Sequence, residues 1–320
     1  MTSGFAEPGD LGMRVVFLGT AGGPNPTPGR RGIATALIVD GDIFLIDAGR
    51  GVLDRYLEAG LGLEHFRAIL ITHMHGDHIS DLFSFLMYGV GTAHGELPSG
   101  TAPLDVIGPG PVHAAVNGSD PFRGPPYPGV GGYLDYSYAG SALTLNSWSI
   151  GMPDLRALVR LHEIEFLPGT SRPTGSFEVF KNDGVTITAT IVPHLEVSFA
   201  YRLDAIHGSV VFSGDTGPSP AVADLVRGAG LLVHEVMDLK ALLRAGFPET
   251  HAPFFRQIHT DIDDVGPIVR QAGVTTLAVN HLLPPKPTTP KATWIQRIGD
   301  TFAGEPIIAE DLMSVAIGKT

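Results

Sequence analysis

The chain contains no cysteine, few cations and no long hydrophobic run. Each of these features excludes certain classes of protein or of functional site. Without cysteine among its 320 residues, it has no disulfide framework and offers a metal no thiolate. No apolar run approaches membrane-spanning length, and the first ten residues lack a basic segment followed by an apolar one. We therefore expect a cytoplasmic protein with neither a membrane span nor a signal peptide.

The charge balance is acidic. Lys and Arg number 21 against 33 Asp and Glu, which gives a formal net charge of -12. Nucleic-acid binding depends largely on cations that neutralise phosphates, so this balance disfavours a polyanionic partner. The hydrophobic content of 43% is enough for a large buried core.

One short segment concentrates side chains that can bind metal. His73, His75, Asp77 and His78 stand within six positions, directly after the apolar run Ala68-Ile-Leu-Ile71. The run fits the end of a buried strand, where side chains two apart share a face, so His73 and His75 can converge on one cation. Asp77 and His78 come after a glycine, where the chain can turn, so we expect them to point toward a second, neighbouring cation. Without a cation these groups would repel and desolvate one another, so the segment predicts a two-metal site.

Three further polar residues follow strand-like runs. His194 comes after residues 185–192, Asp215 after residues 209–212, and His281 after residues 276–280. Each candidate therefore sits at the carboxyl end of an apolar strand, where loops can present side chains to a shared cleft.

Together these residues resemble the His-x-His-x-Asp-His signature of the metallo-β-lactamase superfamily. The resemblance implies an α/β fold, the four-layer αββα sandwich, with two metal ions at one edge. It also implies the ligands of each ion: His73, His75 and His194 for the first, Asp77, His78 and His281 for the second, with Asp215 bridging both.

Further motifs resemble the arylsulfatase-type branch of this superfamily, close to ribonuclease Z. They are Gly19-Thr-Ala-Gly-Gly-Pro-Asn-Pro-Thr-Pro-Gly29, Leu45-Ile-Asp-Ala-Gly-Arg-Gly51, Ser213-Gly-Asp-Thr216, His234-Glu235 and His281-Leu-Leu-Pro-Pro285. The absence of cysteine argues against the antibiotic-hydrolysing branches that use a metal-binding Cys. By resemblance, the catalytic residues are His259, Glu235 and Asp77, and Asp47 is an acceptor that orients a metal-bound His.

The order of elements predicts one domain over residues 1–320. Strands are expected at 13–18, 35–39, 43–46, 68–71, 185–192, 198–203, 209–213, 231–234 and 275–280, with helices near 78–90, 219–228, 261–272 and 290–302. Residues 108–178 form a Gly-, Pro- and aromatic-rich insertion whose only formal cations are four arginines. We expect it to form either a lid over the cleft or a packing or dimer contact, and the resemblance makes a homodimer plausible.

The chemistry implied is metal-assisted hydrolysis, in which two Zn²⁺ ions, or Mn²⁺ or Fe at the same ligands, activate a bridging hydroxide. The main hypothesis is a hydrolase of small-molecule esters, such as aryl sulfates, phosphodiesters or lactones, with nucleic acid disfavoured by charge. The alternative is a ribonuclease Z-like 3′ tRNA-processing endonuclease. A third hypothesis, a metal-bound module without turnover, is disfavoured because both metal positions and proton-transfer residues are present.

Overall fold

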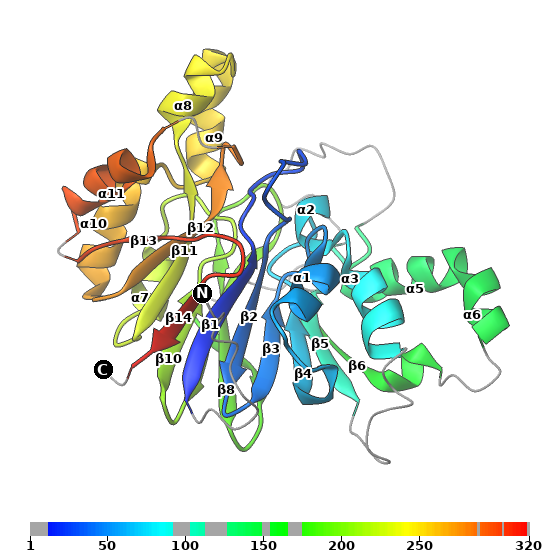
Figure 1. The fold of residues 1–320 in the computed structure, drawn as a ribbon. Coiled ribbons are helices and arrows are strands. Elements are labelled where there is room, and N and C mark those ends of the chain that lie inside the picture. The colour runs from blue at the N-terminus through cyan, green and yellow to red at the C-terminus, as the bar shows by residue number, and fades with distance from the viewer. Residues whose placement is uncertain are drawn as a thin grey trace.

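The computed structural model describes residues 12–91, 103–112, 127–148, 154–165, 175–286, 289–302 and 304–318. Within these ranges two seven-stranded sheets lie face to face, and helices cover the outer face of each sheet (Figure 1). This arrangement is the four-layer α/β sandwich of the metallo-β-lactamase fold that the sequence predicts.

The first sheet has the strand order β14-β1-β2-β3-β4-β5-β6. Its strands are β1 (Met13–Gly19), β2 (Ala34–Val39), β3 (Asp42–Ile46), β4 (Phe66–Leu70), β5 (Leu104–Pro109), β6 (Val159–Ile164) and β14 (Ser314–Ile317). The pairs from β3 to β6 are parallel, whereas β14, β1, β2 and β3 pair antiparallel. Strands β2 and β5 are buried at every position, as expected when both faces of a sheet are covered.

The second sheet has the order β13-β12-β11-β10-β9-β8-β7. Its strands are β7 (Phe177–Lys181), β8 (Val185–Val192), β9 (Ser198–Ala205), β10 (Gly208–Phe212), β11 (Leu231–Met237), β12 (Leu277–Leu283) and β13 (Ile307–Ile308). The strands from β10 to β13 pair in parallel, so the carboxyl ends of β10, β11 and β12 meet at one edge of the sandwich.

Helices lie on the outer side of each sheet and beyond one edge of the sandwich (Figure 1). They are α1 (Val52–Glu58), α2 (Gly76–Ile79), α3 (Leu82–Ser84), α5 (Val130–Gly140), α6 (Ala142–Trp148), α7 (Pro220–Leu225), α8 (Leu239–Arg244), α9 (Ala252–Ile258), α10 (Ile262–Ala272) and α11 (Lys291–Gly299). Figure 1 shows α7, α10 and α11 on the side of the second sheet and α1, α3 and α5 on the side of the first. Of the helices in the described ranges, none combines the length and the apolarity needed to cross a membrane.

Alternation along strand β1 explains the layering. Val15 and Phe17 pack into the core between the sheets, whereas Val16 and Leu18 pack into the core under the helices of the first sheet. Successive residues of a strand point to opposite faces, so the run from Val15 to Leu18, which is apolar at every position, needs cover on both sides. A third core, with Trp294 buried in it, joins the second sheet to its helices.

The segment 108–178, expected to be an insertion, contains regular secondary structure that was not predicted from the sequence. Its described parts include α5, α6 and β6, and β6 pairs with β5 as an edge strand of the first sheet. Leu134 and Tyr138 of α5 are buried against the first sheet's core. The Gly- and Tyr-rich sequence of α5 has weak helix propensity, so packing rather than propensity stabilises it. Residues 113–126, 149–153 and 166–174 lie outside the described residues, and the lid or dimer role stays a prediction.

Candidate metal centre

Seven of the residues singled out in the sequence meet at one edge of the sandwich. His73 and His75 follow β4, His194 follows β8, and Asp215 follows β10. Asp77 and His78 lie in the short helix α2, and His281 lies within β12 rather than after it. The carboxyl ends of these strands therefore bring together side chains that are up to 208 positions apart in the chain, from His73 to His281.

The backbone is distorted where it delivers two of the site's side chains. Asp47 has φ +60° and His281 has φ +44°, a region that residues with a side chain rarely adopt. The pairing of β11 with β12 shifts register at His281, so that residue bulges out of the ladder. Gly22 makes room for it, because a Cβ at Gly22 would lie 2.8 Å from Nδ1 of His281.

The first group of ligand candidates consists of three histidine nitrogens. Nε2 of His73 lies 3.0 Å from Nδ1 of His75, and Nε2 of His194 lies 3.2 Å from the same atom. Lone pairs on neutral imidazoles converge at such distances only when a cation or proton lies between them. His75 thus faces the group with Nδ1, and His73 and His194 face it with Nε2.

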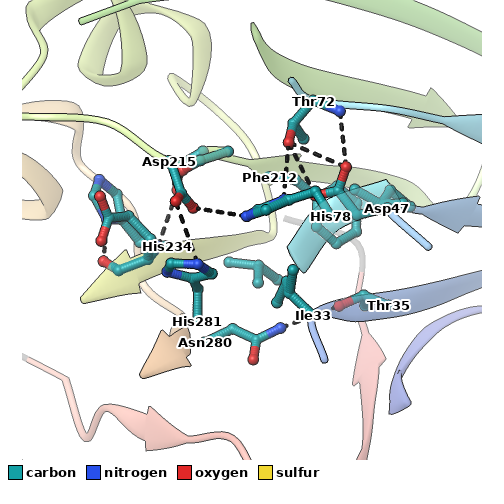
Figure 2. Close-up of a pocket in the computed structure, with 15 residues that line it drawn as sticks. Ile33, Thr35, Asp47, Thr72, His78, Phe212, Asp215, His234, Asn280 and His281 are labelled. Atoms are coloured by element: carbon teal, nitrogen blue, oxygen red, sulfur yellow. Dashed lines mark hydrogen bonds and ion pairs between the residues drawn. The ribbon is translucent and has the colours of Figure 1, made fainter. Parts of the chain in front are cut away.

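The second group is centred on Asp215 (Figure 2). Its carboxylate oxygens lie 3.2 Å from Nε2 of His281, 3.5 Å from Nε2 of His78 and 3.9 Å from Nε2 of His73. Asp77 approaches from the side, with Oδ2 3.4 Å from Nε2 of His281. Because Asp215 contacts rings of both groups, it occupies the position from which one carboxylate can serve two ions.

Partners outside the cluster orient three of the rings. Nδ1 of His73 lies 3.0 Å from Oγ1 of Thr72, and Nδ1 of His194 lies 2.8 Å from the backbone oxygen of Ile258. Nδ1 of His78 lies 2.8 Å from Oδ2 of Asp47, the contact that an acceptor orienting this histidine would make. Asp47 is itself fixed, because Oδ1 accepts the backbone N–H of Thr72 at 2.8 Å. A fixed second nitrogen leaves the first pointing at the cluster.

The electrostatics favour a positive species at the centre. Burial, helped by neighbouring His78, holds the pKa of His73 well below its usual range, and burial lowers the pKa of His194 to about 3. Both rings are therefore neutral and able to donate a lone pair. At His78 burial acts in the same direction, but the carboxylates of Asp215 and Asp47 outweigh it and raise the pKa. Positive charge at the centre of the cluster would therefore stabilise the buried carboxylates.

The donor set fits a metal. Within the described ranges, four overlapping groups of three His or Asp residues have ligand atoms within 4.8 Å of one another, and together they contain all seven residues and His259. Among the described residues, Nε2 of His78 and Oδ1 of Asp215 are buried without a hydrogen-bond partner, which is unusual for buried polar atoms. Imidazole nitrogens and carboxylate oxygens are the ligands that Zn²⁺ and similar divalent ions use when thiolates are absent.

A histidine–glutamate pair borders this cluster. Nδ1 of His259 lies 3.0 Å from Oε1 of Glu235, and the same oxygen accepts the backbone N–H of Thr216 at 2.9 Å. Burial would lower the pKa of His259, but the Glu235 carboxylate outweighs burial and raises it to about 9. Nδ1 of His259 lies within 3.9 Å of the Asp215 carboxylate, so the His259–Glu235 pair lies next to the candidate metal ligands.

Some contributors could not be found from the sequence. Thr72 and the carbonyl of Ile258 hold ligand rings, yet a threonine before a histidine and a backbone oxygen carry no distinctive pattern. Glu196 was also missed, although it follows His194 by two positions; burial raises the pKa of its carboxyl to about 7. Its proximity to His75, at 3.9 Å, arises from the loop between β8 and β9 and not from sequence spacing.

The chain is similar to curated ribonucleases over nearly its whole length. It is 30% identical over 307 residues to ribonuclease Z of Mycobacterium marinum, which covers 95% of this chain and 99% of the relative. It is 30% identical over 314 residues to ribonuclease Z of Mycolicibacterium paratuberculosis, covering 95% and 98%. A family profile described as "Anti-Pycsar protein Apyc1" matches residues 13–93.

Solved structures share the fold at lower identity. Human tRNase Z, short form, superposes with a TM-score of 0.64 at 19% identity and covers 95% of this chain and 99% of that one. Zn²⁺-bound PqqB from Methylobacterium extorquens gives a TM-score of 0.61 at 14% identity, covering 95% and 100%. At these identities the likeness establishes the metallo-β-lactamase fold and no more.

The similarity to ribonucleases overturns one expectation. A small-molecule substrate, with nucleic acid disfavoured, followed from the net charge of -12 and the cation-poor segment 108–178. That expectation is wrong, since the relatives that cover 95% of the chain are named as ribonucleases. The physical reason is that net charge is summed over the whole surface, whereas phosphate contacts depend on the local field within a cleft.

Proposed function

The chain belongs to the ribonuclease Z family of metallo-β-lactamase fold hydrolases, and on this premise we propose that it is a metal-dependent endoribonuclease that cleaves tRNA precursors at their 3′ side. The observation that carries the proposal is the convergence of seven His and Asp side chains, beside a His–Glu pair, in a chain similar to ribonuclease Z over 95% of its length.

We propose that the seven residues hold two Zn²⁺ ions. His73, His75 and His194 would bind one ion and Asp77, His78 and His281 the other, with Asp215 shared between them. Bound there, such ions lower the pKa of a water to near neutrality and offset the negative charge of a phosphodiester. The cysteine-free set of nitrogen and oxygen donors suits zinc, and it also accepts manganese or iron.

We propose that residues of the chain itself supply the proton that the leaving group needs. Hydrolysis joins a water oxygen to phosphorus and breaks the bond to a ribose oxygen, which departs most easily when it receives a proton. Nδ1 of His259 is engaged with Glu235 at 3.0 Å, which leaves Nε2 to face substrate and donate. Glu235, anchored by the backbone N–H of Thr216, fixes the ring. Asp77, with 11% of its side chain exposed, is proposed both as a ligand and as a catalytic contact to substrate.

Asp47 provides a test of the metal assignment that avoids touching a ligand. Asp47→Asn removes the charge that holds Nδ1–H of His78, so the affinity for the ion at His78 should fall by roughly 10- to 100-fold. Competition against a chromogenic chelator measures this. The exposed Asp54→Asn is the matched control. If both variants are folded by circular dichroism and bind the metal with equal affinity, Asp47 does not orient a metal ligand.

The function itself is tested with a defined RNA. Metal-loaded protein should cut a precursor tRNA carrying a 3′ trailer at one site, giving a tRNA of mature length and the released trailer, and addition of a chelator should stop the reaction. The comparison substrate is the same trailer as free single-stranded RNA, which a nonspecific nuclease would degrade equally well. A loaded protein that leaves the precursor intact, at low and at physiological salt, contradicts the proposal.

A further inference from the structure

His75 differs from the other histidines of its group. The rings of His73 and His194 are buried, and each has its second nitrogen within hydrogen-bond distance of an oxygen, on Thr72 and on Ile258. His75 keeps 35% of its side chain exposed, and its second nitrogen has no comparable contact at hydrogen-bond distance among the described residues. A three-histidine site with one loosely held ring would lose metal affinity, because that ring has to be ordered when the ion binds.

One acidic side chain faces the free end of this ring. Nδ1 of His75 points at the nitrogens of His73 and His194, so Nε2 points away from the cluster, and there Oε1 of Glu196 lies 3.9 Å distant. The Glu196 side chain is only 13% exposed, and its Oε1 is buried with no hydrogen-bond partner in the part of the chain that the structure describes. A backbone hydrogen bond from Met74, the residue before His75, supports the same carboxylate.

A buried carboxylate oxygen without a donor is costly, and here the nearest donor belongs to a ligand candidate. We propose that Glu196 is the positioning residue of His75, accepting a hydrogen bond from Nε2–H and so holding Nδ1 toward the metal. The inference rests on the metal site proposed above and adds to it a residue that acts through His75.

The geometry separates this role from direct ligation. Glu196 lies at the Nε2 end of the His75 ring, and the cluster at the Nδ1 end, so the carboxylate and the proposed ion are on opposite sides of the imidazole. Among the described residues, the groups whose ligand atoms converge within 4.8 Å do not include Glu196. Closing 3.9 Å to a charge-assisted hydrogen bond of about 2.8 Å requires a movement of about 1 Å. A partial side-chain rotation supplies that.

The test compares three variants with the wild type. Glu196→Leu removes the acceptor, Glu196→Gln keeps an oxygen of the same shape but removes its charge, and the exposed Glu305→Gln is the matched control. Chelator competition should show one of the two ions weakened by roughly 10- to 100-fold in Glu196→Leu and by less in Glu196→Gln. The other ion and the control should stay at the wild-type value. Thermal melting of the metal-free proteins establishes that each variant is folded.

A second readout reports on the hydrogen bond itself. In metal-loaded protein labelled with ¹⁵N-histidine, Nε2–H of His75 should give a slowly exchanging, downfield proton resonance that is lost in Glu196→Leu and present in Glu305→Gln. A folded Glu196→Leu variant that keeps both the resonance and the affinity overturns the inference alone. Wild-type protein that binds no metal overturns the inference and the proposed function together.

Discussion

Replacing Asp215 by alanine is expected to abolish turnover and to lower metal occupancy at both positions. Asp215 is 2% exposed, and its carboxylate lies within 3.9 Å of nitrogens on His73, from the first ligand group, and on His78 and His281, from the second. Metal catalysis of this kind is worth several kcal/mol of transition-state stabilisation, so the loss in turnover should be about 10³-fold or more.

Elemental analysis after loading and desalting gives the metal content. We expect about two ions in the wild type and fewer than one in Asp215→Ala, because a dinuclear site shares its bridging ligand. His281→Ala serves as the comparison, because His281 contacts Asp77 and Asp215 but none of the three histidines of the first group, so its loss should weaken mainly one ion. The exposed Asp224→Ala controls for loss of an aspartate elsewhere. Two tightly held ions in Asp215→Ala, or a single ion in saturated wild type, would refute the two-metal assignment.

The stability of the metal-free variant adds a further criterion. In wild type, burial disfavours the charged form of Asp215, yet the surrounding histidines hold its pKa well below the usual range. Those contacts stabilise the fold, whereas the alanine variant leaves the nitrogens of His78 and His281 facing an apolar methyl group. The folded fraction must therefore be measured before a loss of turnover is ascribed to the metal.

Much of the clustering at the candidate site could be predicted because its ligand candidates stand where local sequence rules apply. The run from His73 to His78 spans a short loop and the start of helix α2 directly after an apolar strand, and His194 and Asp215 each follow a strand rich in β-branched residues. Parallel strands end at one edge, so residues at their carboxyl ends converge without any knowledge of distances. His281 was placed after its strand but lies within β12, because the bulge that turns it inward leaves no pattern in the sequence.

The contacts that orient the ligands were harder to predict. Ile258 contributes only its carbonyl to His194, 64 positions away, and every residue has a carbonyl. Glu196 approaches His75 through space, and a single glutamate in a loop is ordinarily a solvated surface residue. Strand β6 and helix α5 were missed for a related reason: β6 is a partly exposed edge strand, and α5 depends on packing. The prediction of the substrate class was wrong because the net charge of the whole chain does not report the local electrostatic field within a cleft.

The strongest test of the proton-transfer assignment is His259→Ala, measured across substrates with different leaving groups. If Nε2 of His259 protonates the departing oxygen, turnover on a substrate with a ribose oxygen as leaving group should fall by roughly 10²- to 10⁴-fold. With an aryl phosphodiester that releases nitrophenolate, which needs little protonation, the loss should shrink markedly. The variant lacks a proton donor, whereas the groups that activate water are untouched.

The result depends on separating proton donation from ligation, since His259 lies within 3.9 Å of Asp215. Metal content should therefore equal that of wild type, and a variant that loses an ion would make His259 a ligand instead. The matched control is the exposed His251→Ala, in the same segment between β11 and α10. It should leave turnover on both substrates unchanged. An equal loss on both substrates at full metal content would exclude the acid role. His259, held by Glu235 at 3.0 Å, would then position substrate rather than supply its proton.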